Sequence, residues 1–76
     1  MTKLPTDVSG RDVRAALERA GFVFRRQRGS HIVLRRDHPY ARVIVPDHKQ
    51  IRRGTLSQIL AEADLTVDEF LRLLGR

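Results

Sequence analysis

Glycine, serine and histidine follow one another at positions 29–31, and the aliphatic run Ile32-Val33-Leu34 comes directly after them. Glycine gives the backbone the freedom that a turn needs, and branched or aliphatic residues favour a strand. The sequence therefore predicts that His31 lies on the rigid rim of a sheet, at the edge of a turn. Histidine is the side chain whose ordinary titration range lies nearest to neutral pH. This makes His31 the first candidate for proton transfer.

Basic charge is concentrated around this histidine. The chain has fifteen Lys and Arg against nine Asp and Glu, a formal net charge of +6. Residues 22–53 hold nine of the basic residues and only two acidic ones, and eight of those nine are arginine. A concentrated positive field attracts phosphates, and the planar guanidinium group suits bidentate phosphate recognition. The pattern indicates phosphodiester chemistry on nucleic acid, against the alternative of a basic surface that serves only solubility.

RNA is the nucleic acid that such a site is best suited to cleave. RNA carries its own nucleophile, the 2′-hydroxyl group, so cleavage needs a base, positive charge for the crowded phosphorus centre and an acid for the leaving 5′-oxygen. Metal is optional in this scheme. The three histidines do not have the spacing of metal ligands on a helix, and the chain has no cysteine. We therefore expect His31 to act as general base or acid without a metal or another cofactor.

The other candidate site residues surround His31 or follow the third predicted strand. Ser30 is either a turn residue or a ligand for a phosphate oxygen beside His31. His48 precedes a basic helix start, where unpaired N–H groups favour anions, so phosphate binding suits it better than acid catalysis. His38 lies in a proline turn and is expected to be a solvated loop residue. The predicted RNA-binding set is Arg26, Arg28, Gly29, Ser30, Arg35, His48, Lys49, Arg52 and Arg53.

Local signals predict three helices that flank a three-stranded antiparallel meander. The helices are indicated by capping pairs and by apolar residues at helical spacing. The three capping pairs are Ser9 with Asp12, Thr55 with Gln58, and Thr66 with Glu69. The first predicted helix ends at Gly21 and the last at Gly75.

The predicted strands follow alternating patterns that turn residues interrupt. The first strand begins near Phe22, the second covers about His31–Arg36, and the third covers Ala41–Val45. Each helix has a single apolar face, so the helices are expected to cover one side of the sheet and to leave the other side to water or RNA. The chain should thus form one α+β domain over residues 1–76.

Aromatic residues are few, with three phenylalanines and one tyrosine. The phenylalanines fit core positions, whereas Tyr40 either stacks on a base or packs on its own hairpin. Backbone contacts should therefore dominate RNA binding, with weak sequence preference and strong salt dependence. The chain has neither an apolar run long enough to span a membrane nor a secretory signal, so we expect it to act in the cytoplasm.

The order of four short motifs resembles the HicA (YcfA-like) toxin family of bacterial and archaeal toxin–antitoxin systems. These motifs are Gly29-Ser30-His31, the strand end Val43-Ile44-Val45-Pro46-Asp47-His48, Gly54-Thr55-Leu56 with Ile59-Leu60, and Phe70-Leu71. The resemblance covers nearly the whole chain. It implies a double-stranded-RNA-binding-domain-like fold and a metal-independent mRNA endoribonuclease that a HicB-type antitoxin holds inactive. It also implies that His31 is the catalytic residue.

One position departs from the family pattern. Ile32 stands where many relatives carry a second consecutive histidine, which argues against a paired imidazole at this place. Two other functions stay open on the sequence alone. One is a noncatalytic module that binds double-stranded RNA by its shape. The other is an interaction subunit whose basic face docks an acidic partner protein.

Overall fold

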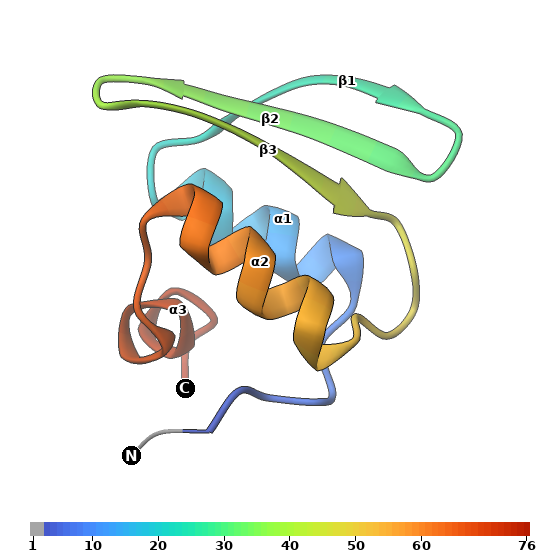
Figure 1. The fold of residues 1–76 in the computed structure, drawn as a ribbon, viewed down its shortest axis with the longest axis vertical. Coiled ribbons are helices and arrows are strands. Elements are labelled where there is room, and N and C mark those ends of the chain that lie inside the picture. Colours follow the sequence, from blue (N-terminus) through green and yellow to red (C-terminus); the bar gives the residue numbers. More distant parts are fainter. Residues whose placement is uncertain (1–2) are drawn as a thin grey trace.

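A computed structural model describes residues 3–76 and has the predicted order of elements, with one helix followed by three strands and two helices (Figure 1). The helices lie together on one side of the sheet, as predicted. In chain order the elements are α1 (Gly10–Arg19), β1 (Val23–Arg28), β2 (His31–Asp37), β3 (Tyr40–Pro46), α2 (Arg53–Ala63) and α3 (Val67–Leu73).

The sheet is an antiparallel meander with the strand order β1-β2-β3. Its inner face, toward the helices, is apolar because alternate residues of β2 and β3 point that way. Ile32 pairs with Val45 and Leu34 pairs with Val43, and all four are buried. The helices cover this face with their own apolar stripes, so the core forms between the two layers. Its helical side includes Val13, Leu17, Leu56, Ile59 and Phe70.

Two of the three predicted helix caps are confirmed. The Ser9 side chain accepts a hydrogen bond from the Asp12 N–H, and the Asp12 carboxylate accepts one from the Ser9 N–H. Thr66 and Glu69 form the same reciprocal pair at the start of α3. Such a pair satisfies two N–H groups that a helix start leaves without partners.

The prediction that Thr55 caps the second helix is wrong. The N-cap of α2 is Arg52, three residues earlier, and no side chain hydrogen-bonds at this cap. The reason is tertiary: Ile51 is buried and its N–H donates to the Val8 carbonyl at 2.9 Å, which fixes where the connector enters the helix. The Leu56 N–H then donates to the Arg52 carbonyl at 2.9 Å within the helix.

The strand β1 departs from simple alternation at a β-bulge. Phe24 pairs with Leu34 and Arg26 pairs with Val33, so Arg25 is the extra residue. Beside the bulge, the predicted burial of the phenylalanines is wrong for one of the two residues. Phe22 and Phe24 were both expected in the core, and Phe22 is buried, but Phe24 is 36% exposed at the sheet edge. There the Arg14 guanidinium lies 4.2 Å from the centre of the Phe24 ring.

Candidate nucleic-acid interface

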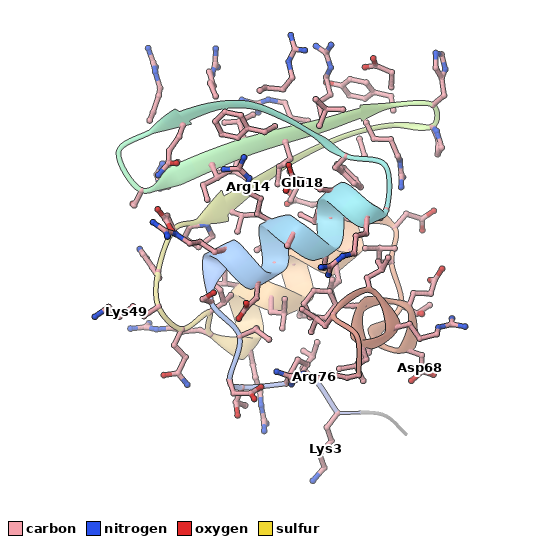
Figure 2. The ribbon with its side chains drawn as sticks, turned by 180° about the vertical axis from the view of Figure 1, so that it is seen from behind. Lys3, Arg14, Glu18, Lys49, Asp68 and Arg76 are labelled. Carbon is pink, nitrogen blue, oxygen red and sulfur yellow. The ribbon has the colours of Figure 1, made fainter. Side chains whose placement is uncertain are left out.

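The outer face of the sheet, which points away from the helices, carries most of the basic side chains of the strands. Figure 2 shows nitrogen-tipped side chains projecting from the sheet on this side. The register of the strands places them in cross-strand rows. From the β1–β2 turn onward, the rows are Arg28–His31–Pro46, Arg26–Val33–Ile44, Val23–Arg35–Arg42 and Asp37–Tyr40.

His31 is exposed in the first of these rows. It is the first residue of β2, its partner on β1 is Arg28, and its partner on β3 is Pro46. The two-residue turn Gly29–Ser30 comes directly before it, and Gly29 has a φ of +55°, a conformation that glycine adopts without strain. The imidazole is therefore open to solvent on the arginine-bearing face, and the strand fixes its backbone.

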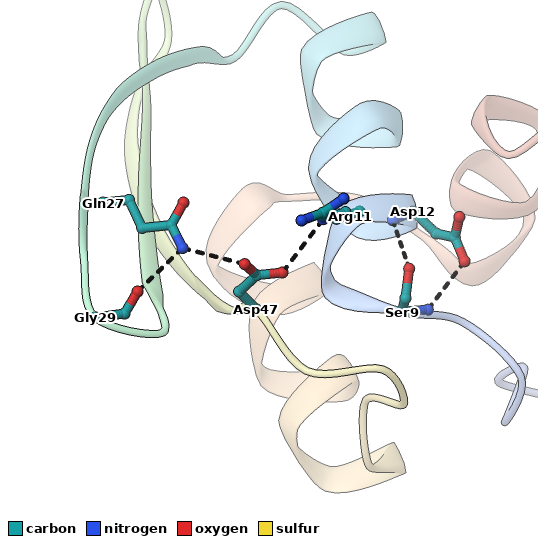
Figure 3. Close-up of polar contacts among 6 residues, drawn as sticks. All are labelled: Ser9, Arg11, Asp12, Gln27, Gly29 and Asp47. Carbon is teal, nitrogen blue, oxygen red and sulfur yellow. Dashed lines mark hydrogen bonds and ion pairs between the residues drawn. The ribbon is translucent and has the colours of Figure 1, made fainter.

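Contacts from other segments hold the β1–β2 turn in place (Figure 3). The Gln27 side-chain amide donates to the Gly29 carbonyl at 3.0 Å and to the Asp47 carboxylate at 3.1 Å. The Asp47 N–H donates in turn to the Ser30 carbonyl at 2.6 Å. The Asp47 carboxylate also forms an ion pair with Arg11 of α1, in which Oδ1 lies 3.7 Å from the arginine Nε. The turn that precedes His31 is thus tied to the segment that follows β3.

The start of α1 packs directly on this segment. The Gly10 N–H donates to the His48 carbonyl at 2.8 Å. A Cβ atom at Gly10 would lie 2.0 Å from the Pro46 carbonyl oxygen, so no side chain fits there without a shift of the backbone. Glycine is required at this position by close backbone approach, which brings the end of β3 against α1.

The second group of predicted RNA contacts lies in the connector after β3 and at the start of α2. His48 and Arg52 line a small hollow with Pro46 and Thr55. Lys49 projects from the connector into solvent (Figure 2). Arg53 is exposed in the first turn of α2, which has no side-chain cap. Pro46 lies between the two groups, because it pairs with His31 and also lines the His48 hollow.

The predicted site residues therefore form two clusters that meet at Pro46. The structure brings Arg26, Arg28, His31 and Arg35 onto one face, and it places His48, Lys49, Arg52 and Arg53 at the neighbouring helix start. His38 is exposed in the β2–β3 turn, at the other end of the sheet from His31.

Sequence reasoning left three outer-face residues out of the site. Arg42 pairs with Arg35, and alternation along β3 would have found it. Tyr40 starts the same strand and is 68% exposed. Arg25 would face outward by simple alternation from Val23, and the bulge, for which the sequence gives no signal, is what adds Arg26 to the same side. Gln27 and Asp47, which hold the turn, also gave no signal because their partners are distant in sequence or belong to the backbone.

The described part of the chain, residues 3–76, contains no group of three or more His, Cys, Asp or Glu side chains that is arranged to hold a metal ion. None of its helices combines the length and the apolar character that a membrane crossing needs.

The order of the elements and the basic outer face define a small α+β domain, in which helices cover one face of a three-stranded antiparallel sheet. Comparison with protein families gives this class a name. The sequence model of the HicA toxin of bacterial toxin–antitoxin systems matches residues 10–65, which is most of the chain. The chain belongs to the HicA toxin family, as the resemblance predicted. No curated protein matches it significantly.

Proposed function

We propose that this chain is the toxin of a toxin–antitoxin pair and acts in the cytoplasm as an endoribonuclease that cleaves mRNA without a metal ion. Membership of the HicA family supports the toxin role and implies an antitoxin partner. The observation that carries the nuclease proposal is the position of His31, exposed beside Arg28 on the outer face of the sheet.

The proposed reaction uses the 2′-hydroxyl group of the RNA as its nucleophile. Its oxygen attacks the adjacent phosphorus, the bond from phosphorus to the 5′-oxygen breaks, and the products are a 2′,3′-cyclic phosphate and a 5′-hydroxyl end. His31 either takes the proton from the 2′-hydroxyl group or donates one to the leaving 5′-oxygen. Arg28, which pairs with His31, stabilises the phosphate and the additional negative charge of the transition state in this proposal, and Arg26 and Arg35 on the same face bind neighbouring phosphates of the RNA.

The connector and the start of α2 extend the proposed contact surface. His48, Lys49, Arg52 and Arg53 bind the RNA backbone in this proposal, together with the amide groups of the Gly29–Ser30 turn. The uncapped start of α2 supports this, since its first N–H groups and the dipole of the helix favour an anion. A HicB-type antitoxin would inhibit the enzyme by covering His31 and neutralising the arginines beside it.

Cleavage by the His31→Ala variant tests the proposal. Wild type and variant are incubated with a structured RNA in the presence of a chelator, and we expect cleavage by the variant to fall about 10²–10⁴-fold. His38→Ala is the matched control, because it removes an exposed histidine from the other end of the sheet and should cut at the wild-type rate. An RNA with a 2′-deoxy nucleotide at the cleavage site should stay intact.

The same assay separates the alternatives. Wild-type cleavage by His31→Ala would refute the role of His31, and loss of wild-type cleavage with chelator would refute the metal-free mechanism. RNA binding without any cleavage would instead support the noncatalytic module. No RNA binding at moderate salt would support an interaction subunit that docks an acidic partner.

A further inference from the structure

The outer face also contains a hollow that includes two of the proposed RNA-binding arginines, Arg26 and Arg35, but not His31. It has a volume of about 320 Å³, near the lower limit for pockets that bind small molecules. The hollow is lined by Arg25, Arg26, Val33, Arg35, Tyr40 and Arg42. Four arginines, one tyrosine and one valine thus line a single depression of the sheet.

The charges of this hollow are largely uncompensated. Arg35 forms an ion pair with Asp37 at 2.9 Å. Within residues 3–76, the guanidinium groups of Arg25, Arg26 and Arg42 form neither an ion pair nor a side-chain hydrogen bond. Clustering like charges without partners is unfavourable for folding, whereas a bound phosphate would relieve the repulsion. Charge complementarity therefore favours an anion as the occupant.

The uncharged part of the hollow favours a planar ring beside that anion. Val33 forms a floor that is almost fully buried, although it belongs to the outer face. Tyr40 lies at the rim that is farther from His31, and it is 68% exposed, so its ring is accessible to a ligand. Aromatic faces and guanidinium planes both stack on nucleobases. A nucleotide, which joins a phosphate to a planar base, satisfies both halves of the hollow.

We propose that this hollow is a nucleotide subsite, which binds one base and its phosphate from the RNA strand that His31 cleaves. The choice of ligand rests on the proposed function. Arg35 and His31 are four residues apart on β2, which is roughly 13 Å along a strand. The nucleotide in the hollow is therefore a different one from the nucleotide at the cleaved bond. By binding that nucleotide, the subsite fixes how the RNA strand lies across the sheet. It therefore determines which phosphodiester bond reaches His31.

The chain offers a specific probe for this subsite, because Tyr40 is its single tyrosine and it has no tryptophan. Labelling with 3-fluorotyrosine places one fluorine at the rim of the hollow. We expect a single-stranded oligoribonucleotide, titrated into labelled chain carrying His31→Ala, to shift the fluorine resonance by stacking. An abasic oligomer of equal charge and oligoglutamate should leave the resonance nearly unchanged.

Two variants give an independent measurement of affinity, again in the His31→Ala background. Tyr40→Leu should weaken oligoribonucleotide binding about tenfold, in the range measured for loss of base–aromatic stacking. Arg42→Gln should weaken binding several-fold and lower the slope of log affinity against log salt by about one. The matched control is Arg72→Gln on α3, which removes the same charge from the helical layer and should preserve affinity.

Each other outcome overturns the subsite. An equal fluorine shift with the abasic oligomer would show a charged surface without base recognition. A shift with oligoglutamate alone would show a site for an acidic protein segment, and no shift with any probe would show an unused hollow. The test does not depend on cleavage. A base-dependent shift, together with no RNA cleavage by the wild-type chain, would refute the nuclease proposal alone, and normal cleavage by the wild-type chain without a shift would refute the subsite alone.

Discussion

The helical layer and the outer face of the sheet both carry many charged side chains, but they use them differently. In the helical layer, Asp12 and Glu69 complete the caps of α1 and α3, and Asp7 binds Arg76 through two hydrogen bonds. The outer face, within residues 3–76, has one ion pair among its arginines. Charge in the helical layer therefore stabilises the fold, and charge on the outer face is available to a ligand.

If the outer face serves a ligand and not the stability of the fold, its apolar residues should also contribute little to stability. The sharpest test compares apolar residues on opposite faces of neighbouring strands. Leu34 is fully buried on the inner face and Ile44 is 42% exposed on the outer face. We expect Leu34→Ala to lower the free energy of unfolding by about 2–5 kcal/mol, and Ile44→Ala by less than about 1 kcal/mol. Urea denaturation measures both values, and equal losses would show that the outer face also carries stability.

A second test addresses the contact between α1 and the end of β3. Gly10→Ala forces a Cβ atom against the Pro46 carbonyl, and we expect it to lower the free energy of unfolding by about 1–3 kcal/mol. Gly54→Ala is the matched control in the first turn of α2, where a Cβ atom meets open space. It should stabilise the chain by up to about 1 kcal/mol. Similar effects of both changes in urea denaturation would contradict the close approach at Gly10.

The smallest expected effect concerns acid stability and involves the helical layer alone. The Thr66 N–H and hydroxyl groups, which hydrogen-bond to Glu69, lower the pKa of its carboxyl group from the ordinary value of 4.5. A lowered pKa stabilises the fold above the unfolded value, and this contribution is lost as the pH falls through the folded value. We expect Glu69→Gln to make the fall of the urea midpoint shallower below pH 4.5. The same pH dependence in the variant and in the wild type would contradict the prediction.

Much of the fold follows from local sequence signals. The capping pairs at Ser9 and Thr66 are local interactions over three residues, and the turn at Gly29 needs only one residue with positive φ. Alternation along β2 and β3 separates the two faces of the sheet without further information. The exposed position of His31 at the rim follows from these signals alone. Its chemical role and its RNA contacts remain predictions.

The rest depends on contacts between distant segments, which short patterns do not contain. The start of α2 is fixed by Ile51 in the core and its bond to Val8, and this overrides the cap pattern at Thr55. The bulge at Arg25 changes which arginines of β1 face outward, because one extra residue reverses the alternation. The sequence therefore predicted a basic face but not the arrangement of its arginines around a hollow.

The strand β1 is an outermost strand of the sheet, and all six of its residues are exposed. An exposed edge offers unpaired backbone groups that a second chain can join, which is a common route to aggregation. Three arginines on this short, bulged strand oppose such pairing between identical copies, since each would bring its charges against those of the other. The side chains that favour phosphate thus also help to keep two copies of the protein from adding to each other edge to edge.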